Sequence, residues 1–277
     1  MLSPKQFKKP IMILNMPNKK LSVIIVNYKS ADFLKKCVDS IYDRINSAVP
    51  FEIIIVNNDI EEKLEMILEN KAEIKIINNH KNLGFGAGNN VGAKLSQGEI
   101  LLFLNPDTEI ISLEIEEAFK LFEKNEELGV AGSRLYSRDG EIEKWSAGYE
   151  FGILDLIKNN LGLSRNKKFW QKGNLVEADW VSAAALFIRK EIFQKIGGFD
   201  ENFFMYFEDM DLCKRVKKAG KKILYQPNFS IKHIGGKSYP EKKVQKADYY
   251  RSQEYYFKKH RNFLEWLTVK ILGKLFY

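Results

Sequence analysis

Four apolar runs of strand length alternate with longer amphipathic segments in the first half of the chain. The runs are Leu21–Asn27, Phe51–Asn57, Ile74–Asn78 and Ile100–Leu104. Apolar runs without regular polar alternation are typical of parallel strands covered on both faces. The segments between them, residues 31–45, 61–70 and 87–96, have the length and composition of helices. The pattern predicts an α/β fold with a doubly wound, mostly parallel sheet and helices on both faces.

The second half of the chain continues with further predicted elements. We expect helices over residues 113–124 and 207–219, and strands over residues 130–135, 183–188 and 223–225. Residues 150–174 are rich in Gly, Asn and Lys and show no clear period, so they are a candidate substrate loop. The predicted organisation is an N-terminal extension over residues 1–20, one large domain over residues 21–240, and a basic helical tail over residues 241–277.

Charge and cysteine content narrow the range of partners. The chain has 44 Lys and Arg against 36 Asp and Glu, and the net charge of +8 favours an anionic partner such as a nucleotide diphosphate, a phospholipid surface or a nucleic acid. Cys37 and Cys213 lack metal-type spacing, which excludes a disulfide framework and a zinc knuckle.

No export signal is visible, and the apolar C-terminus is shorter than the roughly 20 residues of a membrane span. We expect a cytoplasmic location, with a tail that could lie on a membrane.

A carboxylate lies at the tip of the fourth apolar run. Ligands of such sheets bind outside the carboxyl ends of the strands, and Ile100–Leu104 is followed directly by Asn105, Pro106 and Asp107. Asp107 could hold Mg²⁺ or Mn²⁺, which take few protein oxygens and complete their shell with water and substrate phosphates. It could equally be a turn residue or the N-cap of the next helix.

Three acidic residues open the helix predicted over residues 207–219. Glu208, Asp209 and Asp211 suit the positive end of the helix dipole, which is a sufficient structural explanation. The aromatic and apolar residues 203–207 precede them, however, and desolvation by such a wall raises a carboxylate pKa toward values useful for a general base. A structural and a catalytic interpretation both remain open from these residues alone.

Two further segments could bind a phosphate or a metal. Residues 82–92 contain four glycines between a predicted strand and a helix, where the backbone can approach a ligand and the helix N-terminus favours anions. As a dinucleotide fingerprint this loop is flawed, because Asn89 replaces the third glycine. His233 could complete a metal shell and Lys237 could meet a phosphate, although a single histidine after a strand is also common structure.

The order of these motifs resembles the inverting family two glycosyltransferases with the GT-A fold, and most closely their bacterial rhamnosyltransferase-like branch, which builds cell-surface polysaccharide. Seven segments carry the resemblance: residues 23–28 (VIIVNY), 55–58 (IVNN), 82–86 (NLGFG), 104–107 (LNPD), 198–201 (GFDE), 208–212 (EDMDL) and 233–238 (HIGGKS). They cover the chain from about residue 21 to residue 238.

The resemblance implies a metal-dependent enzyme that moves a sugar from a nucleotide-diphosphate donor, with dTDP-rhamnose as the suggested donor, to a hydroxyl of a glycan or polyprenyl-linked acceptor. Asp107 matches the last acid of the DXD-type motif, which meets the divalent cation (Mg²⁺ or Mn²⁺) and the donor diphosphate. Asp209 matches the acid taken as catalytic base, with Glu208 beside it. Asn57 and Asn105 replace two usual aspartates, which leaves Asp107 as the only motif carboxylate on the metal.

The resemblance also implies the wider site. The implied donor residues are Asn27, Tyr28, Asn57, Asn82, Gly84, Phe85, Asn89, Asn105, Asp107 and Lys237. The implied metal ligands are Asp107 and His233, and the implied acceptor residues are Trp180, Ser182, Ala184 and Asp211. The chemistry agrees with these roles, since a cation stabilises the departing diphosphate and a carboxylate base contributes roughly 10²- to 10⁴-fold to the rate.

Two other classes of function compete with this interpretation. A Rossmann-type oxidoreductase could use the glycine loop, with Asp107 on the ribose, and a non-catalytic nucleic-acid binder would suit the charge and the tyrosine pairs at residues 249–250 and 255–256. Neither explains the acids at residues 208–211, so we expect no nucleic-acid partner. The tail after residue 260 fits either a membrane surface or a docking helix for the core or a second copy, and the sequence sets no oligomeric state.

Overall fold

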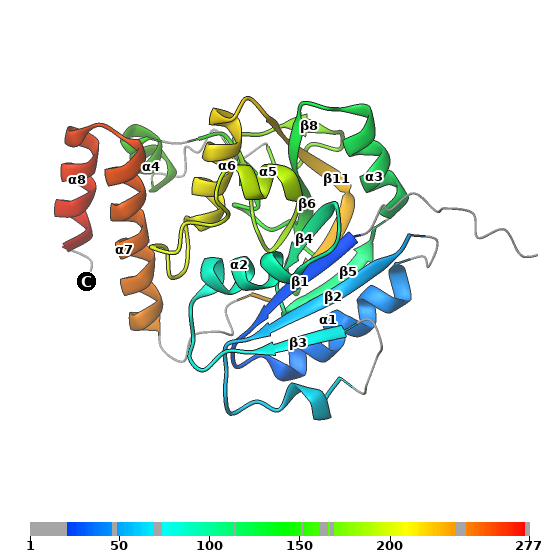
Figure 1. Cartoon of the computed structure of the whole chain (residues 1–277). Coiled ribbons are helices and arrows are strands. Elements are labelled where there is room, and N and C mark those ends of the chain that lie inside the picture. The colour runs from blue at the N-terminus through cyan, green and yellow to red at the C-terminus, as the bar shows by residue number, and fades with distance from the viewer. Residues whose placement is uncertain are drawn as a thin grey trace, which may run out of the picture.

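The computed structural model describes residues 21–45, 49–68, 74–113, 115–150, 152–160, 166, 169–235 and 242–274. A nine-stranded sheet of order β3-β2-β1-β4-β10-β6-β11-β5, with β8 paired to β11, forms its centre (Figure 1). The strands of this sheet are β1 (Leu21–Asn27), β2 (Phe51–Asn57), β3 (Ile74–Asn78), β4 (Ile100–Leu104), β5 (Thr108–Ser112), β6 (Leu128–Tyr136), β8 (Val176–Glu177), β10 (Ala185–Arg189) and β11 (Lys222–His233). Two short strands, β7 (Ala147–Gly148) and β9 (Trp180–Val181), pair separately.

The strands predicted from the apolar runs form a parallel block. β1 pairs in parallel with β2 and with β4, and β2 pairs in parallel with β3. β10 is inserted antiparallel between β4 and β6, and β11 runs parallel to β6 but antiparallel to β5. The predicted α/β fold with a large, mostly parallel central sheet is confirmed, with antiparallel strands added on one side.

Alternate residues of each central strand enter two different cores. Val23 and Ile25 belong to the core beneath α1 (Ala31–Arg44) and α3 (Ile115–Lys124). Ile24 and Val26 belong to the opposite core, which also takes side chains from α2 (Phe85–Leu95), α5 (Lys190–Lys195) and α6 (Glu208–Lys218). Because both faces are buried, the central positions of such a strand are apolar.

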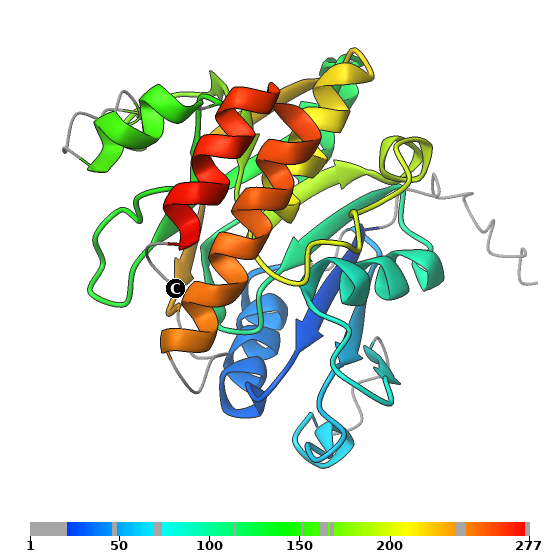
Figure 2. The ribbon, with the colours of Figure 1, turned by 90° about the vertical axis from the view of Figure 1, so that its left-hand side faces the viewer.

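The C-terminal residues form two helices that lie side by side against the domain (Figure 2). They are α7 (Lys242–His260) and α8 (Phe263–Lys274), and α4 (Ile153–Asn160) lies near them. Tyr256, Phe257 and Val269 of these helices are buried in the core that includes α6. In the part of the chain described here, no helix is both long and apolar enough to cross a bilayer.

Three of the predicted elements differ in the structure. The helix expected over residues 61–70 is only a 3₁₀ turn, η1 (Leu64–Met66), because Asn57 and Glu62 tie the preceding chain to the strand ends. Residues 150–174, expected to lack a period, contain α4. β11 continues to His233, well past the expected residue 225, and its register to β6 shifts around Pro227, where proline cannot join a regular ladder.

Candidate active site

A cavity of about 250 Å³ opens at the carboxyl ends of the parallel strands, where such sheets bind their ligands. Loops after β1, β2, β4 and β11 and the start of α2 surround it, and residues 205–206 and α7 close it. Its lining residues are Val26, Tyr28, Asn58, Asn82, Gly84, Phe85, Asn105, Pro106, Asp107, Glu143, Met205, Tyr206, His233, Gly235 and Gln245. The structure therefore brings together seven predicted residues: Tyr28, Asn82, Gly84, Phe85, Asn105, Asp107 and His233.

Strand pairing brings His233 beside Asp107. β11 pairs with β5 so that His233 lies opposite Thr108, and Ile234 donates its backbone N–H to the Asp107 carbonyl at 2.9 Å. The His233 Nε2 atom is then 3.5 Å from Asp107 Oδ1, and its Nδ1 atom is 2.8 Å from Glu143 Oε2. Burial opposes the charged imidazolium, but hydrogen bonds and charges from Asp107 and Glu143 outweigh it and raise the pKa of His233 to about 10.

The residues around Asp107 fit a divalent cation that takes only a few of its ligands from the protein. Asp107 and the Nε2 atom of a deprotonated His233 face each other, and the buried Oδ1 atom of Asn105 accepts no hydrogen bond from any described residue. Carboxylate, amide and imidazole are suitable donors for Mg²⁺ or Mn²⁺. The described residues hold no cluster of three or more His, Cys, Asp or Glu arranged for a metal. A cation here would therefore need donor phosphates and water to complete its shell.

Gly84 lets two backbones meet at the edge of the cavity. Its φ of +86° is in the left-handed region, and a Cβ atom there would lie 2.5 Å from the Phe204 carbonyl oxygen. The next residue, Phe85, donates its N–H to that same oxygen at 2.9 Å. The Asn58 amide donates to the Gly84 carbonyl and to Asn82 Oδ1, at 3.1 and 3.2 Å. The glycine loop thus holds the segment around residue 204 against the donor side of the cavity.

Three predicted donor residues lie behind the cavity instead of lining it. Asn27 and Asn57 stand in register at the ends of β1 and β2, and both are buried. The Asn27 amide donates to Asn57 Oδ1 and to Glu62 Oε2, at 3.1 and 2.7 Å. Asn89 is buried in α2, where its amide donates to the Phe85 carbonyl. Their contacts indicate that they support the loops around the cavity.

Asp209 lies in the first turn of α6 and is partly buried. Its carboxylate accepts the backbone N–H groups of Ala183 and Met210, at 3.3 and 2.8 Å. Burial raises the pKa of Asp209 to about 6 despite these hydrogen bonds. Burial and the Asp209 charge also raise the pKa of Glu208, whose Oε2 atom has no hydrogen-bond partner among the described residues. With a pKa of about 6, the Asp209 carboxylate is suited to accept a proton near neutral pH.

A two-residue bridge joins the Asn105 loop to Asp209. The Ala183 N–H donates to Asp209, while the carbonyl of the next residue, Ala184, accepts the Asn105 N–H at 3.0 Å. The Ser182 hydroxyl accepts the Ala184 N–H at 3.2 Å. Two of the predicted acceptor residues, Ser182 and Ala184, therefore lie between the Asn105 loop and Asp209.

The other two predicted acceptor residues are engaged elsewhere. Trp180 lines a separate cavity of about 270 Å³ together with Lys214 and Tyr256. The side chain of Asp211 is fully buried, and its carboxylate lies within 2.7 Å of the cationic groups of Arg215 and Lys259 and of the His260 Nε2 atom. Burial alone would raise the pKa of Asp211, but these partners, His260 foremost, lower it. An acceptor could not reach this carboxylate without breaking the ion pairs, so we assign it a structural role. Lys237 lies outside the described residues.

Four of the polar lining residues were not predicted from the sequence as site residues. Asn58 adjoins the predicted Asn57, and Tyr206 belongs to the aromatic run before Asp209. Their neighbours in the sequence could therefore have indicated that these two residues lie at the site. Glu143 lies in a loop after β6 and Gln245 lies in the first turns of α7, and neither stands in a motif. Only the folded chain brings these two side chains to the strand ends.

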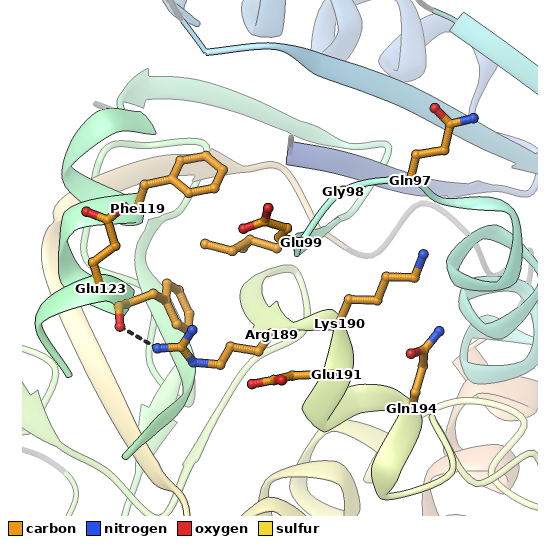
Figure 3. A pocket seen from close by; sticks show the side chains of 11 residues that line it. Gln97, Gly98, Glu99, Phe119, Glu123, Arg189, Lys190, Glu191 and Gln194 are labelled. Atoms are coloured by element: carbon orange, nitrogen blue, oxygen red, sulfur yellow. Dashed lines mark hydrogen bonds between the residues drawn. The ribbon is translucent and has the colours of Figure 1, made fainter. Parts of the chain in front are cut away.

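A larger cavity, of about 520 Å³, lies at the opposite edge of the sheet (Figure 3). Gln97 and Glu99 approach it from the loop before β4, and Arg189 lies at the end of β10, whose register places it opposite Ile100. The Arg189 guanidinium donates to backbone carbonyls of Phe122 and Leu128, so it joins α3 to β6. No predicted site residue lines this cavity, and we assign it no catalytic role.

The chain is similar to known proteins over most of its length. Residues 22–197 match the family described as Glycosyl transferase family 2. The low-salt glycan biosynthesis hexosyltransferase Agl10 of Haloferax volcanii is 29% identical over 210 residues, which cover 73% of this chain and 63% of Agl10. The rhamnosyltransferase WbbL of Escherichia coli K12 is 26% identical over 223 residues, which cover 76% of this chain and 82% of WbbL. The chain spans less than two thirds of the length of several curated relatives.

A solved structure shares the fold. The crystal structure of GalNAc-T7 with UDP, GalNAc and Mn²⁺ superposes with a TM-score of 0.63 at 18% identity, covering 79% of this chain and 44% of that one. At this identity the likeness concerns the fold alone. The GT-A architecture predicted from the sequence is confirmed by it.

Proposed function

We propose, from the premise that this chain belongs to glycosyl transferase family 2, that it transfers a sugar from a nucleotide-diphosphate donor to an acceptor hydroxyl with inversion at the anomeric carbon. One observation carries the proposal. The cavity at the strand ends has Asp107 and His233 on one side, and the peptide at residues 183–184 connects their loop to Asp209, a carboxylate with a raised pKa. Asp209 does not itself line this cavity, but its link to the Asn105 loop supports donor activation and base catalysis at adjoining positions.

On the donor side, Asp107 and His233 would hold a divalent cation, with Asn105 beside them. When bound, such a cation stabilises the negative charge that develops on a leaving diphosphate. Glu143 Oε2 lies 2.8 Å from His233 Nδ1 and would accept a hydrogen bond from it, which leaves the Nε2 atom of the neutral ring to hold the cation beside Asp107. The start of α2 lies at the cavity edge through Gly84 and Phe85, and a helix N-terminus favours phosphate oxygens.

On the acceptor side, Asp209 removes the proton of the attacking hydroxyl. The backbone N–H groups of Ala183 and Met210 fix the carboxylate, so it is oriented before the substrates arrive. The hydroxyl oxygen attacks the anomeric carbon from the face opposite the diphosphate, the bond to the diphosphate breaks, and the proton passes to Asp209. A single displacement of this kind inverts the anomeric centre.

The finer proposal is a rhamnose donor, dTDP-rhamnose, and a glycan or polyprenyl-linked acceptor. The similarity to a rhamnosyltransferase supports this donor. The competing oxidoreductase and nucleic-acid-binding interpretations have less support, because the family match includes the glycine loop and the Asn105–Asp107 motif.

We further propose that a membrane surface presents the acceptor. Leu154 of α4 and several residues of α8 expose apolar side chains, and Glu265 of α8 lies against Gly152 at the start of α4. We call this group the α4–α8 patch; its members are Leu154, Phe263, Leu264, Ile271 and Leu272. The net charge of +8 suits an anionic lipid surface, on which basic and apolar side chains act together.

A thermal-shift panel tests the proposed reaction. The protein is melted with dTDP-rhamnose, UDP-glucose and UDP-N-acetylglucosamine, each with and without Mn²⁺, and the donor that stabilises it most is used in transfer assays. We expect Asp107→Ala to lose the Mn²⁺-dependent shift, and Asp209→Asn to keep the shift but lose turnover. Asp139→Asn, an exposed loop residue, is the matched control. The proposal fails if no nucleotide sugar raises the melting temperature, or if Asp209→Asn transfers sugar at the wild-type rate.

A further inference from the structure

Helix α7 contributes a side chain to the donor cavity. Gln245, near the start of α7, lines the cavity, and its Nε2 atom donates to the hydroxyl of Tyr206 at 2.7 Å. Tyr206 lines the same cavity. α7 lies beyond residues 22–197, the part that matches the family model, so that match does not include this wall.

The same face of α7 holds the whole segment that carries Tyr206. The Ser252 hydroxyl donates to the Met205 carbonyl at 2.7 Å, and the ring of Tyr249 lies 5.7 Å from Tyr206 and 5.3 Å from Phe207. Gln245, Tyr249 and Ser252 are spaced by four and three residues, which places them on one face of a helix. The wall is therefore built by an ordered set of contacts along α7.

The backbone of this wall is strained. Tyr206 and Phe207 both have a left-handed conformation, with φ of +70° and +64°. Bulky residues keep such conformations only where the surrounding structure holds them, and such strain occurs preferentially at functional sites. The contacts with α7 supply that restraint, so the Tyr206 side chain is fixed in the cavity before any ligand binds.

The position of the wall suggests which part of the donor it meets. The diphosphate side of the cavity is defined by Asp107 and His233, and Asp209 follows Tyr206 by only three residues. The sugar must lie between the diphosphate and the base, because its anomeric carbon is attacked from the face opposite the diphosphate. Tyr206, three residues before Asp209, and Gln245, which is hydrogen-bonded to it, line the same part of the cavity. A primary amide can both donate to and accept from sugar hydroxyls.

We infer that Gln245 is a specificity-determining residue that hydrogen-bonds a hydroxyl of the donor sugar, and that the Tyr206 hydroxyl fixes the orientation of its amide. The inference rests on the proposed function, because it requires a nucleotide-sugar donor in this cavity. A site built to hydrogen-bond a hydroxyl discriminates strongly against a ligand that lacks it, since the buried polar group is left unpaired.

The test compares a nucleotide sugar with its own nucleoside diphosphate. Isothermal titration calorimetry with Mn²⁺ measures dTDP-rhamnose and dTDP, or the corresponding pair for whichever donor the wild-type panel selects. We expect Gln245→Ala to weaken binding of the nucleotide sugar about 10-fold and to change binding of the nucleoside diphosphate by no more than about two-fold. Tyr206→Phe should weaken binding of the nucleotide sugar by a smaller factor, because Gln245 keeps its side chain but loses its orienting partner.

The control and the second variant separate recognition from folding. Lys246→Ala changes an exposed neighbour on α7 that does not line the cavity, and it should bind both ligands as the wild type does. If Gln245→Ala is unfolded by circular dichroism, Gln245→Met, which keeps the side-chain length, takes its place. The inference is overturned if the folded variant binds both ligands as the wild type does, or loses both equally. A wild-type protein that binds neither ligand of any pair would instead refute the proposed function itself.

Discussion

At the scale of single residues, Asp209 has the two properties that a base requires, a fixed position and a raised proton affinity. Two backbone N–H groups hold its carboxylate, and burial raises its pKa to about 6. Keeping this carboxylate away from water costs free energy and raises its pKa. Only the ionised form can take the proton of the acceptor. The same environment makes its activity sensitive to pH just below neutrality.

We expect the turnover number to fall as pH decreases through about 6, approaching a tenfold loss per pH unit, because the protonated form of Asp209 cannot act as a base. Above this pKa the rate should reach a plateau. Initial rates at saturating donor between about pH 5 and pH 8 measure this. Asp209→Asn should reduce turnover by about 10²- to 10⁴-fold on this plateau. A wild-type profile that stays flat down to about pH 5 would contradict the assignment.

Glu143 acts on the metal side through His233. Its carboxylate is 2.8 Å from His233 Nδ1 and lines the donor cavity. We expect Glu143→Ala to weaken Mn²⁺ affinity in the presence of nucleoside diphosphate by about 10- to 100-fold, because the imidazole loses the partner that orients it. Titration of Mn²⁺ followed by electron paramagnetic resonance measures the change. Glu141→Ala, an exposed residue of the same loop, should have no effect; equal losses in both variants would argue against a role for Glu143.

At the scale of elements, prediction from sequence succeeded where burial leaves a simple pattern. β1, β2 and β4 are buried along almost their whole length, and the apolar runs matched β1 to β4 at both ends, including the edge strand β3 with its exposed Lys75 and Asn78. β5, with the sequence TEIIS, ends in two exposed residues, and its apolar pair was too short to signal a strand. β11 was expected to end near residue 225 because Pro227 interrupts it, whereas a register shift lets it continue to His233.

The same contrast holds for the candidate site. Asp107, Asn105 and Asn82 follow strands directly, and the carboxyl ends of parallel strands share one edge, so their meeting was predictable. Glu143 and Gln245 reach the cavity from a loop and a helix that carry no periodic or motif signal. Their positions depend on how β11 and α7 pack against the sheet, which a single sequence does not encode locally.

The junction of α6 and α7 depends on one buried acid. Asp211 meets Arg215 of its own helix and Lys259 and His260 of α7. We expect Asp211→Ala to reduce the free energy of unfolding by about 3–5 kcal/mol, because it leaves these cationic groups partly buried without their counter-charge. Urea-induced unfolding followed by circular dichroism measures the loss.

The matched control for this variant is an ion pair on the surface between α7 and α8. Glu254 lies 3.8 Å from Lys270, and both side chains are more than a third exposed. Glu254→Ala should therefore cost less than about 1 kcal/mol. If Asp211→Ala costs no more than this control, the ion cluster does not anchor α7.

At the scale of the whole molecule, five of the exposed large apolar side chains lie on the α4–α8 patch, while others such as Ile60 and Met66 lie elsewhere. Phe263 and Leu264 are 66% and 72% exposed, which is unusual for two adjacent large apolar residues outside an interface. α8 also packs on the domain through Val269, so the patch is held rigidly relative to the cavity. A membrane contact here would set the distance between the bilayer and the base.

We expect the double variant Phe263→Ser and Leu264→Ser to bind vesicles containing phosphatidylglycerol at least about 10-fold more weakly than the wild type, because two side chains lose their contact with the lipid. Flotation assays measure this binding, which should also fall at high salt. Ile60→Ser with Met66→Ser removes two equally exposed apolar residues elsewhere and should change nothing. Unchanged flotation of the α8 variant would favour a protein partner for the patch.

The bridge at residues 183–184 has a kinetic consequence. The Ala184 carbonyl accepts a hydrogen bond from the Asn105 N–H, and the neighbouring Ala183 N–H donates one to Asp209. A shift of the Asn105 loop is therefore passed to the base. Loading of the first substrate would then align the group that activates the second. The enzyme should follow a compulsory order, with the nucleotide sugar entering before the alcohol, and the spent nucleoside diphosphate leaving last as a competitive inhibitor of the donor.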